Sequence, residues 1–134
     1  MSRRGLWARL SLLAVALSGM VGCSGGGVSG PKPFDAMTGD EHLACAVDIS
    51  AYTYLMAARK IPEDRDMAGK SVLALAWHHN AYALPQGEKE QYDLINRKRA
   101  ELMASDKPDA IAGRAAGCIE AALAKHEADE KRRR

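Results

Sequence analysis

The chain has 134 residues, with 19 basic and 17 acidic side chains, a formal net charge of +2 and only 5% aromatic residues. This length suits one small domain. The near balance of charge and the scarcity of aromatic residues argue against a nucleic-acid-binding protein, which needs a clustered basic surface and stacking side chains.

The first 22 residues have the layout of an export signal. Arg3, Arg4 and Arg9 give a positive start, and residues 10–20 form an apolar stretch of signal-peptide length that is too short to span a bilayer. We therefore expect residues 1–22 to be a signal peptide that is removed. The pair Arg3-Arg4 is similar to a twin-arginine export signal, but adjacent arginines are also ordinary in any signal peptide.

The apolar stretch ends in Met20-Val21-Gly22-Cys23, which resembles the lipobox of bacterial lipoprotein precursors. The resemblance implies cleavage before Cys23 and a covalent lipid on Cys23, which would anchor the protein in a membrane. Two alternatives are ordinary signal peptidase cleavage near residues 16–18 and an uncleaved anchor.

The residue after the cysteine is Ser24, which resembles precursors sorted to the outer membrane of Gram-negative bacteria. The implied location is the cell envelope, on the periplasmic face of the outer membrane, although the sequence leaves the inner membrane open. No cofactor is expected beyond the lipid on Cys23.

Cysteine number and charge both change once the signal is removed. Removal of Arg3, Arg4 and Arg9 leaves one more acidic than basic side chain, so the net charge becomes negative. With Cys23 assigned to lipid, Cys45 and Cys118 remain, and we expect them to form one disulfide in an oxidising periplasm.

After the cysteine comes a stretch rich in Gly, Ser and Pro, so we expect residues 23–37 to be a lipidated cysteine and flexible linker before a helical domain at 38–130. Thr38 and Glu41 have the form of a capping box that begins a helix over 39–60. Its apolar residues form two strips on nearly opposite sides. We therefore expect neighbouring helices on both sides of it.

Three further helices are expected over 66–84, over 88–104 and after Asp106, which we expect to be the N-cap, with Pro108 in the first turn. No segment alternates in the manner of a strand. The predicted class is all-α: a small four-helix up-down bundle closed by one disulfide, with the first and last helices as antiparallel neighbours. The core residues expected from the second helix are Met67, Leu73, Ala74, Ala76, Trp77 and Ala81.

The chain ends in a basic tail at 131–134, expected to extend beyond the bundle. One interpretation is a solvated helix end that suits the helix dipole. The other is contact with anionic envelope material, such as lipid phosphates. The residues concerned are Lys131, Arg132, Arg133 and Arg134.

Motifs that suggest chemistry are incomplete. Gly69-Lys70-Ser71 matches the end of a phosphate-binding loop, but Asp64 stands where that loop needs glycine. A metal site would need histidines such as His42, His78 and His79 to converge. Adjacent histidines point about 100° apart on a helix, so we expect polar histidines on the helix surface.

The aromatic residues at helical spacing are expected in the core rather than on a binding surface. There is no combination of nucleophile, base and orienting acid, so we expect a protein that is not an enzyme.

These observations favour a non-catalytic binding or structural module of the cell envelope, with an envelope protein as partner and an undetermined oligomeric state. One alternative is a periplasmic stress or chaperone-like helical protein that exposes apolar surface in acid. Another is a bundle that binds a cofactor or a metal.

Overall fold

A computed structural model describes residues 31–82 and 87–134; the expected signal peptide, Cys23 and most of the expected linker lie outside this part. The described chain forms α1 (Gly39–Ala57), α2 (Arg65–Ala81), α3 (Glu88–Ser105) and α4 (Pro108–Arg133), preceded by a 3-10 turn, η1 (Phe34–Ala36). The predicted all-α four-helix bundle is confirmed. None of these helices is long and apolar enough to cross a bilayer.

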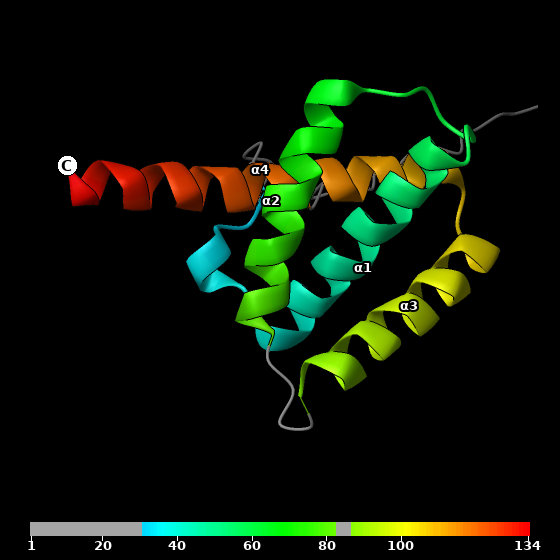
Figure 1. The fold of residues 1–134 in the computed structure, drawn as a ribbon, viewed down its shortest axis with the longest axis horizontal. Coiled ribbons are helices and arrows are strands. Elements are labelled where there is room, and N and C mark those ends of the chain that lie inside the picture. The colour runs from blue at the N-terminus through cyan, green and yellow to red at the C-terminus, as the bar shows by residue number, and fades with distance from the viewer. Residues whose placement is uncertain (1–30, 83–86) are drawn as a thin grey trace, which may run out of the picture.

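Helix α1 is the central helix and contacts each of the other three. Figure 1 shows it between α2 and α3, with α4 lying across the bundle. One side of α1 packs on α2 and α4 through Ile49 and Met56, and another packs on α3 through Val47. The predicted two-sided packing of α1 is therefore confirmed. Tyr54, one of the aromatic residues expected in the core, is nevertheless 51% exposed.

The start of α1 follows its sequence signal. The Glu41 amide donates to Thr38 Oγ1 at 3.2 Å, and the Thr38 amide donates to Glu41 Oε2 at 2.7 Å, which completes the capping box. The helix ends at Ala57 rather than at residue 60, because Arg59 has a φ of 56°. This left-handed conformation is incompatible with a continuing α-helix.

The predicted core face of helix α2 is only partly right. Met67, Ala74 and Trp77 belong to the core or pack against it, as expected. Ala76 and Ala81, which we also expected there, are exposed, whereas Ser71 and His78 are completely buried. Small side chains at positions 71 and 74 suit the close contact of α2 with α1.

The N-cap of α4 is Lys107 without a side-chain cap, so the predicted capping role of Asp106 is wrong. The Asp106 carboxylate accepts a hydrogen bond from Arg114 instead. Pro108 occupies the first turn, as predicted. A Pro at this position needs no capping partner for its own nitrogen, because it has no N–H.

The predicted disulfide joins α1 to α4, with Cα atoms of Cys45 and Cys118 5.4 Å apart. The last turns of α4 project past the other helices in Figure 1. They include the residues expected as a basic tail, which are helical up to Arg133. Three of these basic side chains pair with carboxylates one turn earlier, in Lys131–Glu127, Arg132–Asp129 and Arg133–Glu130.

Residues 31–37, which we call the strap, pack on the helices, so the linker prediction fails for this part. Phe34 is only 8% exposed and belongs to the main core. Two ion pairs flank it: Lys32–Glu41 at 2.8 Å and Lys125–Asp35 at 2.9 Å. The packed domain therefore includes the strap, because a buried aromatic side chain outweighs the local Pro-rich composition.

Candidate functional site

A groove of about 760 Å³ lies between α1, α3 and the first turns of α4. We call it the α1–α3 groove. Its apolar lining comes from Leu43 and Val47 of α1 and Leu102 of α3. Its charged lining residues are Asp40, Asp48, Lys98, Glu101, Asp106 and Arg114. The carboxylates outnumber the cations, and because Asp48 and Asp106 both pair with Arg114, the exposed acidic lining is supplied by Asp40 and Glu101.

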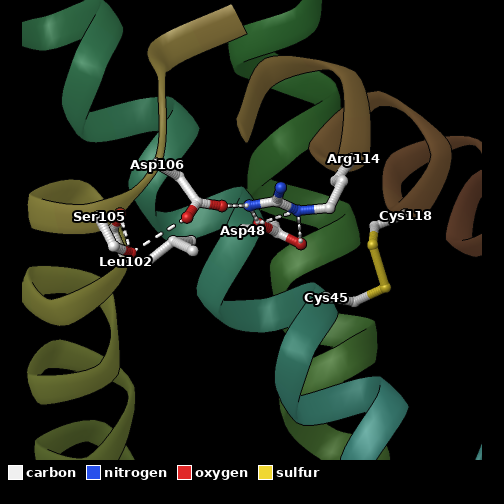
Figure 2. Close-up of polar contacts among 7 residues, drawn as sticks. All are labelled: Cys45, Asp48, Leu102, Ser105, Asp106, Arg114 and Cys118. Carbon is white, nitrogen blue, oxygen red and sulfur yellow. Dashed lines mark hydrogen bonds and ion pairs between the residues drawn. A yellow bond between two sulfur atoms is a disulfide. The ribbon is translucent and has the colours of Figure 1, made fainter. Parts of the chain in front are cut away.

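An ion-pair network holds one end of this groove (Figure 2). Arg114 Nε donates to both Asp48 oxygens, at 3.1 and 3.2 Å, and Arg114 Nη2 donates to Asp106 Oδ2 at 2.7 Å. Ser105 Oγ donates to Asp106 Oδ1 at 3.0 Å. The network thereby joins α1, the α3–α4 turn and α4 around a single guanidinium group.

Asp48 is the buried member of the network, with 7% of its surface exposed. Burial raises the pKa of the Asp48 carboxyl above its ordinary value, and the hydrogen bonds and charge of Arg114 oppose this shift. The same pairing with Asp48 raises the pKa of Arg114. Arg114 therefore remains a fixed cation whose bidentate contact compensates for a carboxylate largely removed from water.

A second, smaller hollow of about 320 Å³ shares Ala44, Asp48 and Arg114 with the groove. Its other lining residues include the disulfide cysteines together with Pro31 and Met37 of the strap. The Asp48–Arg114 pair therefore contributes to both hollows. A change in this pair would alter two neighbouring surfaces of the molecule.

The structure overturns the expected surface location of the histidines. His42 is buried, His79 is buried against the ring of Tyr92, and His78 is completely buried. The Nδ1 atoms of His42 and His78 lie 3.0 Å apart, and His78 Nε2 lies 2.9 Å from the Cys118 carbonyl oxygen. We call these two residues the histidine pair.

The carbonyl contact assigns the protons of this pair. A carbonyl oxygen only accepts, so His78 carries a proton on Nε2 and, as a neutral ring, accepts at Nδ1. His42 must then donate from its own Nδ1. Burial lowers the pKa of both imidazoles, which favours this neutral arrangement.

The residues considered for metal or phosphate binding make other contacts. Among residues 31–82 and 87–134, no three His, Cys, Asp or Glu side chains converge as metal ligands. The sulfur of Cys45 lies in the disulfide. The Gly69-Lys70-Ser71 segment is inside α2, where Lys70 pairs with Asp66 and Ser71 Oγ donates to the Met67 carbonyl.

The aromatic residues divide between core and surface. Trp77 is partly buried against Phe34, and Tyr52 is buried, which agrees with a core role. Tyr54 and Tyr92 are about half exposed. The guanidinium of Arg99 lies 5.3 Å from the centre of the Tyr54 ring.

Sequence reasoning did not find the ion-pair network, because its two main members lie on different helices, 66 positions apart. One signal was present: Asp48 stands directly between Val47 and Ile49 in the apolar part of the first helix. A carboxylate in such a position needs a buried partner.

Comparisons of this chain with families of known proteins, with curated proteins and with solved structures find no match. The residues and geometry described above are therefore the basis for the function.

Proposed function

We propose that the chain is a lipid-anchored, non-catalytic module of the cell envelope that binds an envelope protein through the α1–α3 groove. The observation that carries the binding role is the groove itself, in which an apolar lining is combined with exposed carboxylates. The lipid anchor at Cys23 rests on the lipobox resemblance. The two parts of the proposal are tested separately.

The lining of the groove specifies the chemistry of the partner. Leu43, Val47 and Leu102 suit apolar side chains, and the exposed carboxylates of Asp40 and Glu101 suit basic ones. A polypeptide segment that carries both kinds of residue, such as one face of an amphipathic helix, combines these features. These exposed carboxylates would mainly increase the association rate and the specificity of binding.

The ion-pair network supports this role by fixing the shape of the groove. Arg114 links Asp48 of α1 to Asp106 in the α3–α4 turn. The groove is therefore formed before a partner arrives. Preformed surfaces lose less conformational entropy on binding than surfaces that must be ordered.

A photoreactive amino acid at position 44 tests the groove in cells. Ala44 is exposed and lines the groove, whereas Ala76 is an exposed alanine on α2 and is the matched control position. We expect a discrete crosslinked protein from position 44 but not from position 76. Crosslinking should fall severalfold in the variant Asp40→Lys/Glu101→Lys, because like charges then oppose a basic partner.

Glu63→Lys is the control for charge reversal, since Glu63 is exposed in the turn after α1 and does not line the groove. It should leave the crosslink unchanged. Equal crosslinking from positions 44 and 76, or a crosslink insensitive to reversal at the groove, would refute binding there. A cofactor that co-purifies with the protein would favour the cofactor-binding alternative instead.

The anchor is tested by intact mass spectrometry of the protein recovered from membranes. We expect loss of residues 1–22, the mass of attached acyl groups on Cys23, and two thiols that react with an alkylating reagent only after reduction. Cys23→Ser should abolish the lipid mass and release the protein from the membrane fraction. An unmodified Cys23 in the wild-type protein would overturn the anchor, while the groove experiment would remain valid.

A further inference from the structure

The strap covers the histidine pair. The ring centroid of Phe34 lies 4.5 Å from that of His42 and 4.9 Å from that of His78. On its other side Phe34 makes an edge contact with Trp77 at 5.7 Å. The burial of Phe34, and with it the position of the strap, therefore depends on the two imidazole rings on which it packs.

The number of protons on the histidine pair decides whether the hydrogen bond between the two Nδ1 atoms can form. One added proton is tolerated, because His78 can donate from both nitrogens if His42 accepts at Nδ1 and keeps its proton on Nε2. A second proton places N–H groups on both Nδ1 atoms, which lie 3.0 Å apart. The hydrogen bond is then impossible, and two like charges face each other inside the protein.

We propose that the histidine pair is an acid-sensitive latch: it holds the strap on the helices while the pair is neutral or carries one added proton, and it releases the strap when both imidazoles are protonated. The latch is a property of the strap side of the molecule. It does not depend on the α1–α3 groove or on the identity of its partner.

Nearby charges oppose the latch but do not cancel it. Asp35 of η1 and Glu41 of α1 favour the charged form of His42, yet burial is the larger effect and the pKa of His42 is lowered. Each of these carboxylates already pairs with a lysine, Asp35 with Lys125 of α4 and Glu41 with Lys32. From α4, His78 meets the uncharged Cys118 carbonyl.

One more titratable group lies close by on α4. The ring of His126 contacts Trp77 at 5.8 Å and so lies one aromatic ring away from Phe34. It makes no hydrogen bond with the pair among the contacts of the described residues. It therefore provides the control for a histidine that is near the strap but outside the pair.

The pKa shifts give the direction of the pH effect. Both imidazoles have pKa values below the ordinary value of about 6.5. When the strap is released, the imidazoles take up protons at a higher pH than they do in the closed state. Closure is therefore favoured above about pH 6.5 and is lost as the pH falls through the lowered pKa values of the two imidazoles. Acid is thus the opening condition.

Release of the strap would uncover apolar surface. A hollow of about 400 Å³ lies between the strap and α4, lined by Phe34 and by the small residues Ala121, Ala124 and Ala128. Removal of the strap opens this hollow and exposes Trp77 and the histidine pair. Exposure of apolar surface in acid with helices retained is the behaviour expected of the stress-related alternative.

Hydrogen exchange of the full chain, measured by mass spectrometry, tests the latch. Peptides covering residues 31–38 should be protected at pH 7.5 and lose protection as the pH falls below about 6.5, with exchange corrected for its intrinsic pH dependence. Opening should increase about tenfold per pH unit for each proton taken up. Peptides from α1 and α4 should keep their protection over the same range.

Two variants separate the latch from general acid sensitivity. His42→Asn/His78→Gln keeps amide groups near the positions of the bonded nitrogens but does not titrate, so protection of the strap should become independent of pH. His126→Gln should behave as the wild-type chain does. Unchanged strap protection in the wild type down to pH 4.5, or simultaneous loss in the strap and all four helices, would overturn the latch.

A crosslinked strap keeps the test valid if the histidine variant does not fold. A Cβ built on Gly117 would lie 3.7 Å from the Pro31 Cβ, which is the separation found in disulfides. Pro31→Cys/Gly117→Cys should therefore tie the strap to α4 and abolish acid-induced binding of an apolar dye. Pro31→Ser/Gly117→Ser should keep that dye binding, and equal dye binding by the crosslinked variant would contradict strap release.

Discussion

Replacing Cys45 and Cys118 with alanine should lower the free energy of unfolding by about 4 kcal/mol. The disulfide joins residues 73 positions apart, so its removal frees most of the described chain in the unfolded state. A domain of this size has a stability of only several kcal/mol. We expect the variant to be largely unfolded at about 37 °C. Far-UV circular dichroism measures the loss of helix, and urea denaturation measures the loss of stability.

Reduction of the wild-type protein is the matched control, because it breaks the same bond without changing volume. The reduced protein and the double alanine variant should lose similar amounts of stability. A loss below about 1 kcal/mol in both would mean that the bond adds strain in the folded state or that the unfolded chain is already compact.

Arg114→Met should destabilise the fold by about 1–3 kcal/mol, since it leaves the buried Asp48 carboxylate without its main partner. Arg114 itself is 43% exposed in its side chain, so the loss of the arginine alone accounts for little of this cost. The measurement is urea denaturation at pH 7. Arg97→Met, a change at an exposed arginine of α3, should have a much smaller effect.

A double-mutant cycle distinguishes an unpaired charge from lost packing. Adding Asp48→Asn to Arg114→Met should recover part of the stability, because a neutral amide is less costly to bury than a carboxylate. The deficit of Arg114→Met relative to wild type should also shrink in acid. Burial raises the pKa of Asp48, so protonation of this group removes the penalty as the pH falls, and the penalty returns as the pH rises through the raised value.

Sequence patterns predicted the local structure well wherever the signal acts over one helical turn. The capping box of Thr38 and Glu41 marked the start of α1, and Pro108 marked the first turn of α4. The pairing of Cys45 with Cys118 also followed from the sequence, since these are the two cysteines that remain after Cys23 is assigned to lipid. Helix ends were less accurate, because backbone conformations such as that of Arg59 have no side-chain signal.

The failures concern polar residues whose partners lie far along the chain. His42 and His78 look like surface histidines in their own helices, and only packing of α1 on α2 supplies each with the other as a partner. Asp106 has the sequence of an N-cap, but its carboxylate accepts a hydrogen bond from Arg114, and the N-cap of α4 is Lys107. In both cases a tertiary contact replaced the local one.

For the strap, the amino-acid composition was also a poor guide to the structure. A segment with two prolines close to a glycine-rich stretch is typical of a linker. A single buried aromatic residue, Phe34, and two flanking ion pairs attach it to the helices. No periodic pattern marks one isolated anchor residue. The candidate groove was likewise invisible in the sequence, since its lining comes from three helices.

A disulfide between the first and last helices sets an order of events during biosynthesis. On the proposed export route, Cys45 would leave the export machinery well before Cys118, and during that interval the nearest thiol along the chain would be Cys23. The shorter loop between Cys23 and Cys45 would close about 1 kcal/mol more easily than the native one. Acylation of the Cys23 thiol would remove this competitor, so the lipid that we propose as the anchor would also prevent mispairing before the fourth helix has been made.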